Sequence, residues 1–253
     1  MVKTKLDMKR IPKHIGIIMD GNRRWAAKRG LTSVQGHEAG VKALVKIVEH
    51  CLDLGVETLT IYTLSTENWR KRAKKEVEGI FNLLIKVVEE RKEEYKEKGV
   101  KIAVLGDFQA FPRKVIKAIK EILAIVKEHE RLKVNVALNY GGRDEILRAV
   151  KKIVGQKVPP GKINEKMFGE FLYTNNTPDP DLIIRTGGEI RLSNFLLWQS
   201  SYSELYFTDT LWPAFTPVKL DKAIADYQKR TRRLGGGKFE AYKKPTKRSL
   251  SRK

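Results

Sequence analysis

The chain has 253 residues, 41% of them hydrophobic, and is long enough to bury the core of one large domain. It has no run of about 18 apolar residues, and its first residues, MVKTKLD, lack the apolar core of a signal peptide, so we expect a cytoplasmic protein. Its one cysteine, Cys51, excludes an intrachain disulfide and a Cys/His zinc cluster, and we interpret it as a small core residue.

The formal net charge of +21 predicts an anionic substrate or partner. Eleven basic residues and one acid, Glu240, lie between Tyr227 and Lys253, so we separate a single domain over residues 1–236 from a basic tail over residues 237–253. Such a tail can bind RNA or dock on an anionic membrane. Because it holds few aromatic residues, we expect peripheral membrane contact and no nucleic acid.

Strand and helix signals alternate along the domain, without internal repeats. In chain order the apolar patterns predict a strand at Ile15–Met19, a helix over Glu38–Leu54, a strand at Thr58–Leu64, a helix over Glu76–Lys98, a strand at Lys101–Leu105, a helix over Arg113–Glu128, a strand at Val134–Leu138, a helix over Glu145–Val154, a strand at Leu182–Arg185 and a helix over Leu220–Arg233. Strands separated by helices of this length predict an α/β fold with a central, mostly parallel sheet flanked by helices.

Polar segments follow several of these strands, at the point where the apolar run ends. They are Asp20, Ser65–Asn68, Asn139–Arg143 and Arg185. Ligands of open α/β sheets bind beyond the carboxyl ends of the strands, so we expect these segments to converge on one rim.

The most informative segment is His14–Trp25, HIGIIMDGNRRW. Its apolar run ends in Asp20, a carboxylate that can hold a divalent cation. Arg23 and Arg24 follow at the opening of a helix, where two cations oppose the helix dipole unless an anion binds there. Backbone N–H groups and guanidinium groups both suit phosphate oxygens, so the segment predicts a metal-assisted diphosphate site.

Two further clusters fit the same chemistry. Ser65–Trp69, STENW, places a carboxylate, an amide and a tryptophan at a strand end, which suits a lined pocket better than a simple capped turn. In residues 185–193, RTGGEIRLS, two arginines and a serine are spaced around a glycine turn and can surround a second diphosphate. Glu204 can supply a second carboxylate to the cation at Asp20, and His37 is either a phosphate donor or a polar residue at a helix start.

Together these segments resemble the cis-prenyltransferase family, the undecaprenyl and polyprenyl diphosphate synthases, over residues 11–236. The motifs that carry the resemblance are His14–Trp25, Gly36–Gly40, Ser65–Trp69, Asn139–Arg143 and Arg185–Pro213. The resemblance implies one catalytic domain with the family's α/β fold and hydrophobic tunnel, a homodimer and Mg²⁺ dependence. It implies repeated condensation of isopentenyl diphosphate onto an allylic primer, geranylgeranyl or farnesyl diphosphate. The implied product is a long-chain polycis-polyprenyl diphosphate, the lipid carrier precursor for glycosylation or wall synthesis.

The resemblance also implies a role for each matching residue. Asp20 would bind the metal, and Glu204, which can come from across the dimer, would complete the metal site. The implied allylic diphosphate site comprises Gly21, Asn22, Arg23, Arg24 and His37, with Trp25 and Trp69 in its wall. The remaining implied substrate-binding residues are Ser65, Thr66, Glu67 and Arg72, with Arg185, Arg191, Leu192 and Ser193 for isopentenyl diphosphate. Asn68 matches the catalytic position often proposed as proton acceptor, but a neutral amide is a poor base, so we interpret it as a positioning residue and leave the base open.

The chain departs from the family pattern at three places. Ser33 stands where the family usually has an arginine, which weakens one phosphate contact, and Arg23 stands where some members carry glycine. The segment Trp69–Glu76 is one residue longer than usual, so either Arg72 or Lys71 fills the basic position after the tryptophan.

Two other functions are compatible with parts of the sequence. An RNA-binding module would use the basic tail, and a silent partner subunit would keep the fold without the activity. Asp20, Arg24, Arg185, Arg191 and Glu204 are all present in one chain, which favours an active enzyme. The lysine- and glutamate-rich composition resembles that of an archaeal-type member, which would imply a geranylgeranyl primer.

Overall fold

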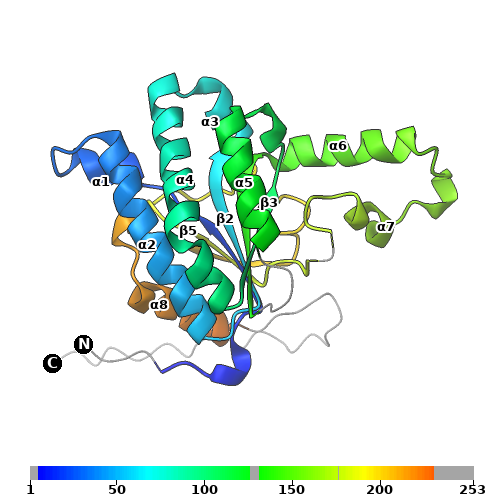
Figure 1. Ribbon diagram of the computed structural model, residues 1–253. Coiled ribbons are helices and arrows are strands. Elements are labelled where there is room, and N and C mark those ends of the chain that lie inside the picture. Colours follow the sequence, from blue (N-terminus) through cyan, green and yellow to red (C-terminus); the bar gives the residue numbers. More distant parts are fainter. Residues whose placement is uncertain (1–4, 126–130, 176, 231–253) are drawn as a thin grey trace, which may run out of the picture.

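The computed structural model describes residues 5–125, 131–175 and 177–230 of the chain (Figure 1). The strands in these residues are β1 (His14–Ile18), β2 (Thr58–Ser65), β3 (Val100–Leu105), β4 (Leu132–Tyr140), β5 (Leu182–Arg185) and β6 (Glu204–Phe207). They pair in parallel in the order β3-β4-β2-β1-β5-β6, which confirms the expected α/β fold with a parallel sheet. The basic tail over residues 237–253 lies outside the described residues, so its contact with a membrane stays a prediction.

Helices connect and flank the strands. They are α1 (Asn22–Ala27), α2 (Ser33–Asp53), α3 (Thr66–Lys71), α4 (Lys74–Glu97), α5 (Arg113–Ile125), α6 (Gly142–Gly155), α7 (Glu165–Glu170) and α8 (Pro217–Lys229), with the short 3-10 helices η1 (Met8–Arg10), η2 (Phe108–Ala110), η3 (Pro160–Lys162) and η4 (Trp212–Ala214). Every predicted helix is present with shifted ends. For example, α2 begins at Ser33 rather than Glu38, because Thr32 and Gln35 form a reciprocal capping box. Among the described helices, none combines the length and the hydropathy that a membrane span requires.

Different kinds of structure bury the two faces of the sheet. Helices α2, α4 and α5 cover one face (Figure 1), where Ile15 and Ile17 of β1 pack in a core with Ile47 of α2. The alternate residue Ile18 belongs to a second core with Phe195, which lies in a segment without helix or strand. A strand that is buried on both faces carries a continuous apolar run, as β1 does.

Two side chains of α2 have structural roles, which the sequence predicted for Cys51. Cys51 is fully buried, and burial raises the pKa of its thiol to about 12, so it is an unreactive core residue. Nε2 of His50 lies 2.6 Å from Oδ1 of Asp221, which ties α2 to α8.

His14 connects the strands through a buried chain of hydrogen bonds. Its Nδ1 lies 2.6 Å from the carbonyl oxygen of Pro178, and its Nε2 lies 2.7 Å from Oγ1 of Thr60 on β2. That oxygen also accepts a 3.1 Å hydrogen bond from Nδ2 of Asn135 on β4. A neutral ring that donates from Nδ1 and accepts at Nε2 satisfies both of its contacts. Burial lowers the pKa of His14 from 6.5 to about 4, which keeps the ring neutral.

We expect the free energy of unfolding to depend on pH through His14. Its folded pKa of about 4 is below the unfolded value of 6.5, so the unfolded chain binds more protons between these values and stability falls as the pH falls below 6.5. Between about pH 7.5 and about pH 5, the wild type should lose about 2 kcal/mol more than His14→Gln in urea unfolding. The same pH dependence in both proteins would contradict a buried neutral ring.

Candidate active site

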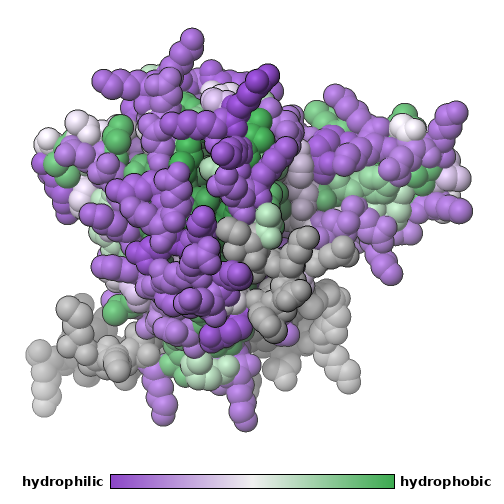
Figure 2. All heavy atoms as spheres, in the orientation of Figure 1, coloured by the Kyte–Doolittle hydropathy of each residue, from purple (hydrophilic) through white to green (hydrophobic). Residues whose placement is uncertain are grey.

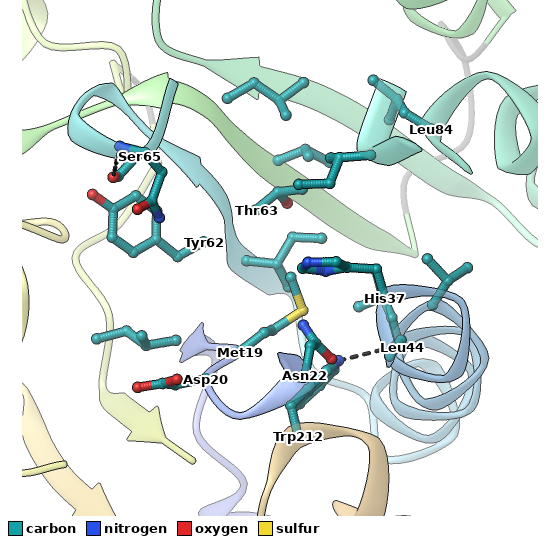
Figure 3. A pocket seen from close by; sticks show the side chains of 18 of the residues that line it. Met19, Asp20, Asn22, His37, Leu44, Tyr62, Thr63, Ser65, Leu84 and Trp212 are labelled. Atoms are coloured by element: carbon teal, nitrogen blue, oxygen red, sulfur yellow. Dashed lines mark hydrogen bonds between the residues drawn. The ribbon is translucent and has the colours of Figure 1, made fainter. Parts of the chain in front are cut away.

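A cavity of about 1110 Å³ extends from the carboxyl ends of β1 and β2 into the space between α2, α4 and the sheet. Its polar lining includes Asp20, Asn22, His37, Ser65 and Arg185, and its apolar lining includes Leu44, Val48, Leu84, Val88 and Val136. Figure 3 shows Asp20, Tyr62 and Ser65 on one side of this space and Leu44 and Leu84 on the other. The volume exceeds the roughly 300–1,000 Å³ of most small-molecule pockets, and with its apolar interior it matches the predicted hydrophobic tunnel.

Asp20 and Arg185 form the centre of the polar end. Asp20 lies just after β1, and Arg185 is the last residue of the neighbouring strand β5. The two lie close together because Ile18, at the end of β1, pairs in register with Arg185. Nη2 of Arg185 lies 3.0 Å from Oδ2 of Asp20, and Nη2 of Arg24 lies 3.0 Å from Oδ1. Arg185 is only 4% exposed, so the carboxylate compensates a cation that water barely reaches.

Arg185 also orders the segment that follows β5. Its Nη1 donates to the carbonyl oxygen of Arg191 and to Oγ of Ser193, both at 2.6 Å. The side chain of Arg191 is exposed and pairs with Glu189 at 2.6 Å. All four residues line the cavity, so the structure brings together the two arginines and the serine that the sequence predicted as a cationic group.

His37 lies on α2 and belongs to a cluster around Glu76 of α4. Oε1 of Glu76 accepts hydrogen bonds from Nε2 of His37 at 3.3 Å, Oγ of Ser33 at 3.3 Å and Nη1 of Arg72 at 3.2 Å. Burial lowers the pKa of His37 although the hydrogen bond to Glu76 opposes this shift. The ring is therefore neutral near neutral pH and donates from Nε2. Arg72, and not Lys71, lines the cavity.

Glu76 was not among the predicted site residues. Burial raises the pKa of its carboxyl, but the charge of Arg72 and the hydrogen bond from His37 outweigh burial, so that the pKa is lowered. The carboxylate is thus ionised and holds both nitrogen donors. The sequence carried a signal for it, since Glu76 is the first acid after the basic run over residues 70–75.

The turn between β1 and α1 is tightly packed. Gly21 has a φ of 116°, and a Cβ there would lie 2.9 Å from Leu211. Asn22 follows, close to Gly40 of α2, and its Oδ1 is buried without a hydrogen-bond partner in the described structure. Trp212 donates from Nε1 to the carbonyl oxygen of Gly40 at 2.9 Å, which places Trp212 and Asn22 beside each other (Figure 3). This packing fixes the direction in which Asp20 enters the cavity.

Helix α3 brings the second predicted cluster to the cavity. Oγ of Ser65 accepts a 3.0 Å hydrogen bond from the backbone N–H of Asn68 and so caps the helix. Glu67 lies between them in sequence, and all three residues line the cavity. Burial raises the pKa of Glu67, but hydrogen bonds from its own N–H, Asn194 and Ser65 outweigh this and lower it.

Some predicted residues do not line the cavity. Trp25, Thr66, Trp69 and Leu192 are not part of its lining. Trp25 stacks under the guanidinium group of Arg29 at 4.2 Å, and Trp69 packs against Phe81 and Phe111. Trp69 belongs to the same hydrophobic cluster as Leu84, which does line the cavity.

Two predicted segments are not brought to Asp20. Glu204 begins β6 and pairs with Leu182 at the amino end of β5, while Asp20 lies beyond the carboxyl ends. Its carboxylate accepts a 2.8 Å hydrogen bond from Arg230, so within one chain it does not complete a metal site at Asp20. Asn139–Arg143, expected at the same rim, does not line the cavity.

The donor set at Asp20 suits a metal that arrives with a phosphate. Among the described residues, no three His, Cys, Asp or Glu side chains lie close enough together to bind a metal by themselves. Mg²⁺ is often held by one or two carboxylates together with substrate phosphates, and it does not need a closed protein cage. Asp20 lies in the cavity between guanidinium groups that also suit phosphate, so these residues fit a Mg²⁺–diphosphate pair.

The chain is similar to known proteins along most of its length. A family profile described as "Putative undecaprenyl diphosphate synthase" matches residues 18–235. The isoprenyl transferase of Heliobacterium mobile is 48% identical over 238 residues, which cover 92% of this chain and 91% of that protein. The isoprenyl transferase of Aquifex aeolicus is 46% identical over 226 residues, which cover 89% of this chain and 96% of that protein.

Solved structures share the fold. Lavandulyl diphosphate synthase from Lavandula x intermedia, in complex with dimethylallyl diphosphate, superposes with a TM-score of 0.86 at 34% identity and covers 90% of this chain and 100% of its own. A "probable undecaprenyl diphosphate synthase" from Campylobacter jejuni superposes with a TM-score of 0.75 at 35% identity and covers 89% of this chain and 99% of its own.

We expect Asp20→Ala to destabilise the fold as well as change the site. It leaves the buried guanidinium group of Arg185 without its carboxylate, which should cost about 3 kcal/mol in urea unfolding. Asp20→Asn keeps an acceptor oxygen and should cost less. Glu189→Ala, which removes the half-buried partner of the exposed Arg191, is the control and should cost less than about 1 kcal/mol. Wild-type stability of Asp20→Ala would contradict the role of this salt bridge.

Proposed function

Because the chain belongs to the undecaprenyl diphosphate synthase family of prenyltransferases, as its motifs predicted, we propose that it condenses isopentenyl diphosphate repeatedly onto an allylic prenyl diphosphate. The observation that carries this proposal is the cavity of about 1110 Å³. At one end it has two cationic groups, one with Arg23, Arg24 and Arg72 and the other with Arg185 and Arg191, and its interior is apolar. Two diphosphates require cations, and a growing hydrocarbon chain requires apolar space. A protein that binds one small ligand requires neither the second group nor this volume.

In this proposal the allylic diphosphate binds beside Asp20. Arg23 and Arg24 line the cavity from α1, and His37 and Arg72 line it from the side of α2 and α4. Arg24 already contacts Asp20 at 3.0 Å, so a diphosphate there would meet a guanidinium group next to a carboxylate that can share its cation.

Isopentenyl diphosphate binds at the second group, Arg185, Arg191 and Ser193. The side chain of Arg191 is exposed and pairs with the neighbouring Glu189 at 2.6 Å, so it can turn to an incoming phosphate. The Asp20–Arg185 contact of 3.0 Å joins the two groups, and this closeness lets two bound substrates react as if the step were unimolecular.

The proposed reaction forms a bond from C4 of isopentenyl diphosphate to C1 of the allylic substrate. The diphosphate group leaves C1 of the allylic substrate as this bond forms. A proton then leaves C2 of the added unit, and the new double bond is cis. Arg23 and Arg24 stabilise the charge that develops on the leaving diphosphate. Mg²⁺ held through Asp20 would supply further neutralisation of that charge. Asn68 positions substrate, since its neutral amide is a poor base.

The lengthening chain occupies the apolar interior between α2, α4 and the sheet. The related lavandulyl diphosphate synthase was solved with dimethylallyl diphosphate, which supports an allylic diphosphate as the kind of ligand this fold binds. The choice between a geranylgeranyl and a farnesyl primer, the archaeal-type origin and the use of the product as a lipid carrier stay predictions.

We also propose a homodimer formed through α6. This helix projects from the body of the molecule together with α7 (Figure 1), and hydrophobic side chains gather along the projecting arm (Figure 2). Leu147, Val150 and Val154 are 60%, 43% and 69% exposed and are spaced three and four residues apart, which places them on one face of the helix. The same stripe on a second copy would bury this face in a two-fold interface.

The reaction is tested with labelled isopentenyl diphosphate and each allylic primer. We expect butanol-extractable polyprenyl product with Mg²⁺ and none with EDTA, because the Asp20 carboxylate repels the leaving diphosphate unless a cation lies between them. Chromatography of the product then gives the primer preference and the chain length. Folded protein that makes no product with any primer would contradict the proposal and favour the silent partner subunit.

Two variants separate the two cationic groups in the same assay. Arg24→Ala should raise KM for the allylic primer by roughly tenfold, and Arg191→Ala should raise KM for isopentenyl diphosphate by a similar factor. Equal effects of both variants on both KM values would contradict the assignment of separate subsites.

The dimer is tested by mass in solution. Leu147→Glu combined with Val154→Glu should convert a dimer to a monomer in light scattering, because charges would replace the exposed stripe. Val218→Glu, which changes an apolar residue of α8 that is 48% exposed, is the matched control and should leave the dimer intact. A wild-type monomer would contradict this assignment.

A further inference from the structure

Asn194 connects three segments that are far apart in the sequence. Its backbone carbonyl oxygen accepts a 2.8 Å hydrogen bond from the N–H of Gly142. Its Oδ1 accepts a 2.9 Å hydrogen bond from the N–H of Arg143, and its Nδ2 donates a 2.9 Å hydrogen bond to Oε1 of Glu67. One residue therefore ties the segment after β5 to the first turn of α6 and to α3.

The contacts at α6 replace a missing helix cap. Gly141, the N-cap residue, has no side chain to accept from the first N–H groups of the helix. The two acceptors of Asn194 supply this function to Gly142 and Arg143 from a position 51 residues away from Arg143. The beginning of α6 thus serves as an anchor for the segment that holds Asn194.

The backbone around Asn194 is held in an unusual conformation. Ser193, Asn194 and Leu196 have φ values of 49°, 67° and 43°, in the left-handed region. This region costs roughly 1–2 kcal/mol per residue with a side chain, and asparagine tolerates it better than most. Gly141 leaves room for the contact between Asn194 and α3, because a Cβ at Gly141 would lie 2.7 Å from Nδ2 of Asn194 and 2.8 Å from Oγ1 of Thr66. Surrounding contacts are what maintain such a backbone.

Asn194 and its neighbours form part of the cavity wall, between Arg185 and α3. Ser193, the preceding residue, accepts the 2.6 Å hydrogen bond from Arg185, and Tyr62 donates to its carbonyl oxygen at 3.4 Å. On the other side, Glu67 precedes Asn68 in α3. Ser193, Asn194, Glu67 and Asn68 all line the cavity, so a shift of Asn194 would move residues of the second subsite relative to α3.

We propose that Asn194 is a positioning residue that fixes Ser193 and Arg191 in the isopentenyl diphosphate subsite and sets the register of this subsite against α3. This inference rests on the proposed function. A positioning role differs from a purely structural one, because loss of the Asn194 side chain should affect the binding of isopentenyl diphosphate more than the binding of the allylic primer.

Asn194→Gly removes the side chain and still permits the left-handed backbone conformation. Glycine adopts a positive φ freely, so the variant removes both side-chain hydrogen bonds and keeps the conformation. We expect KM for isopentenyl diphosphate to rise by roughly tenfold, while KM for the allylic primer stays within about twofold. An unchanged KM for isopentenyl diphosphate, or equal changes for both substrates, would overturn the proposal.

Exchanging donor and acceptor gives a rescue test. Asn194→Asp still accepts from the N–H of Arg143, but it places a second carboxylate against Glu67, and it should impair isopentenyl diphosphate binding as Asn194→Gly does. Glu67→Gln added to Asn194→Asp supplies an amide donor to the new carboxylate and should restore most of the loss. Failure of the double variant to improve on Asn194→Asp would overturn the Asn194–Glu67 link.

Asn164→Gly is the matched control. Oδ1 of Asn164 caps α7 through the N–H of Met167 at 3.0 Å, away from the cavity, so this variant should lower thermal stability and leave both KM values unchanged. Activity of the wild type distinguishes a failure of the proposed function from a failure of the role of Asn194. A wild type without elongation activity refutes the proposed function, whereas an active wild type with normal KM values in Asn194→Gly refutes only the role of Asn194.

Discussion

The salt bridge between Asp20 and the buried Arg185 joins the two cationic groups of the active site. Both residues stand at the carboxyl ends of neighbouring parallel strands, and their contact follows from the register of β1 against β5. The carboxylate compensates a guanidinium group that is only 4% exposed. That guanidinium group in turn orders the segment that carries Arg191 and Ser193, so the second subsite depends on the first.

The cavity depends on how a parallel sheet distributes polarity. The strand ends lie together at one edge and carry polar residues, whereas the strands themselves face helices with apolar side chains. Leu44 and Val48 of α2 and Leu84 and Val88 of α4 line the same cavity as Asp20. One continuous space therefore has a charged end for diphosphates and an apolar interior for hydrocarbon, as elongation of a prenyl chain requires.

Elements with a clear apolar pattern could be predicted from the sequence, and short polar ones could not. The predicted helices repeat their apolar spacing over several turns, and strands such as β1 and β5 carry continuous apolar runs. In contrast, α3 and α7 have six residues each, which is too short for a helical period to appear, and the four residues of β6 begin with the charged Glu204. Neighbouring strands and caps such as Ser65 stabilise these elements, and this support exists only in the folded chain.

By itself, the sequence determined which residues carry charge and which strand each of them follows, since Asp20 ends one apolar run and Arg185 ends another. Tertiary structure decided which of them meet. Glu76 reaches His37 across 39 residues of chain and Asn194 reaches Glu67 across 127, whereas Glu204 lies at the opposite end of β6 from the rim. The reason is that local patterns encode strand order and burial, while contacts between loops depend on how distant segments pack.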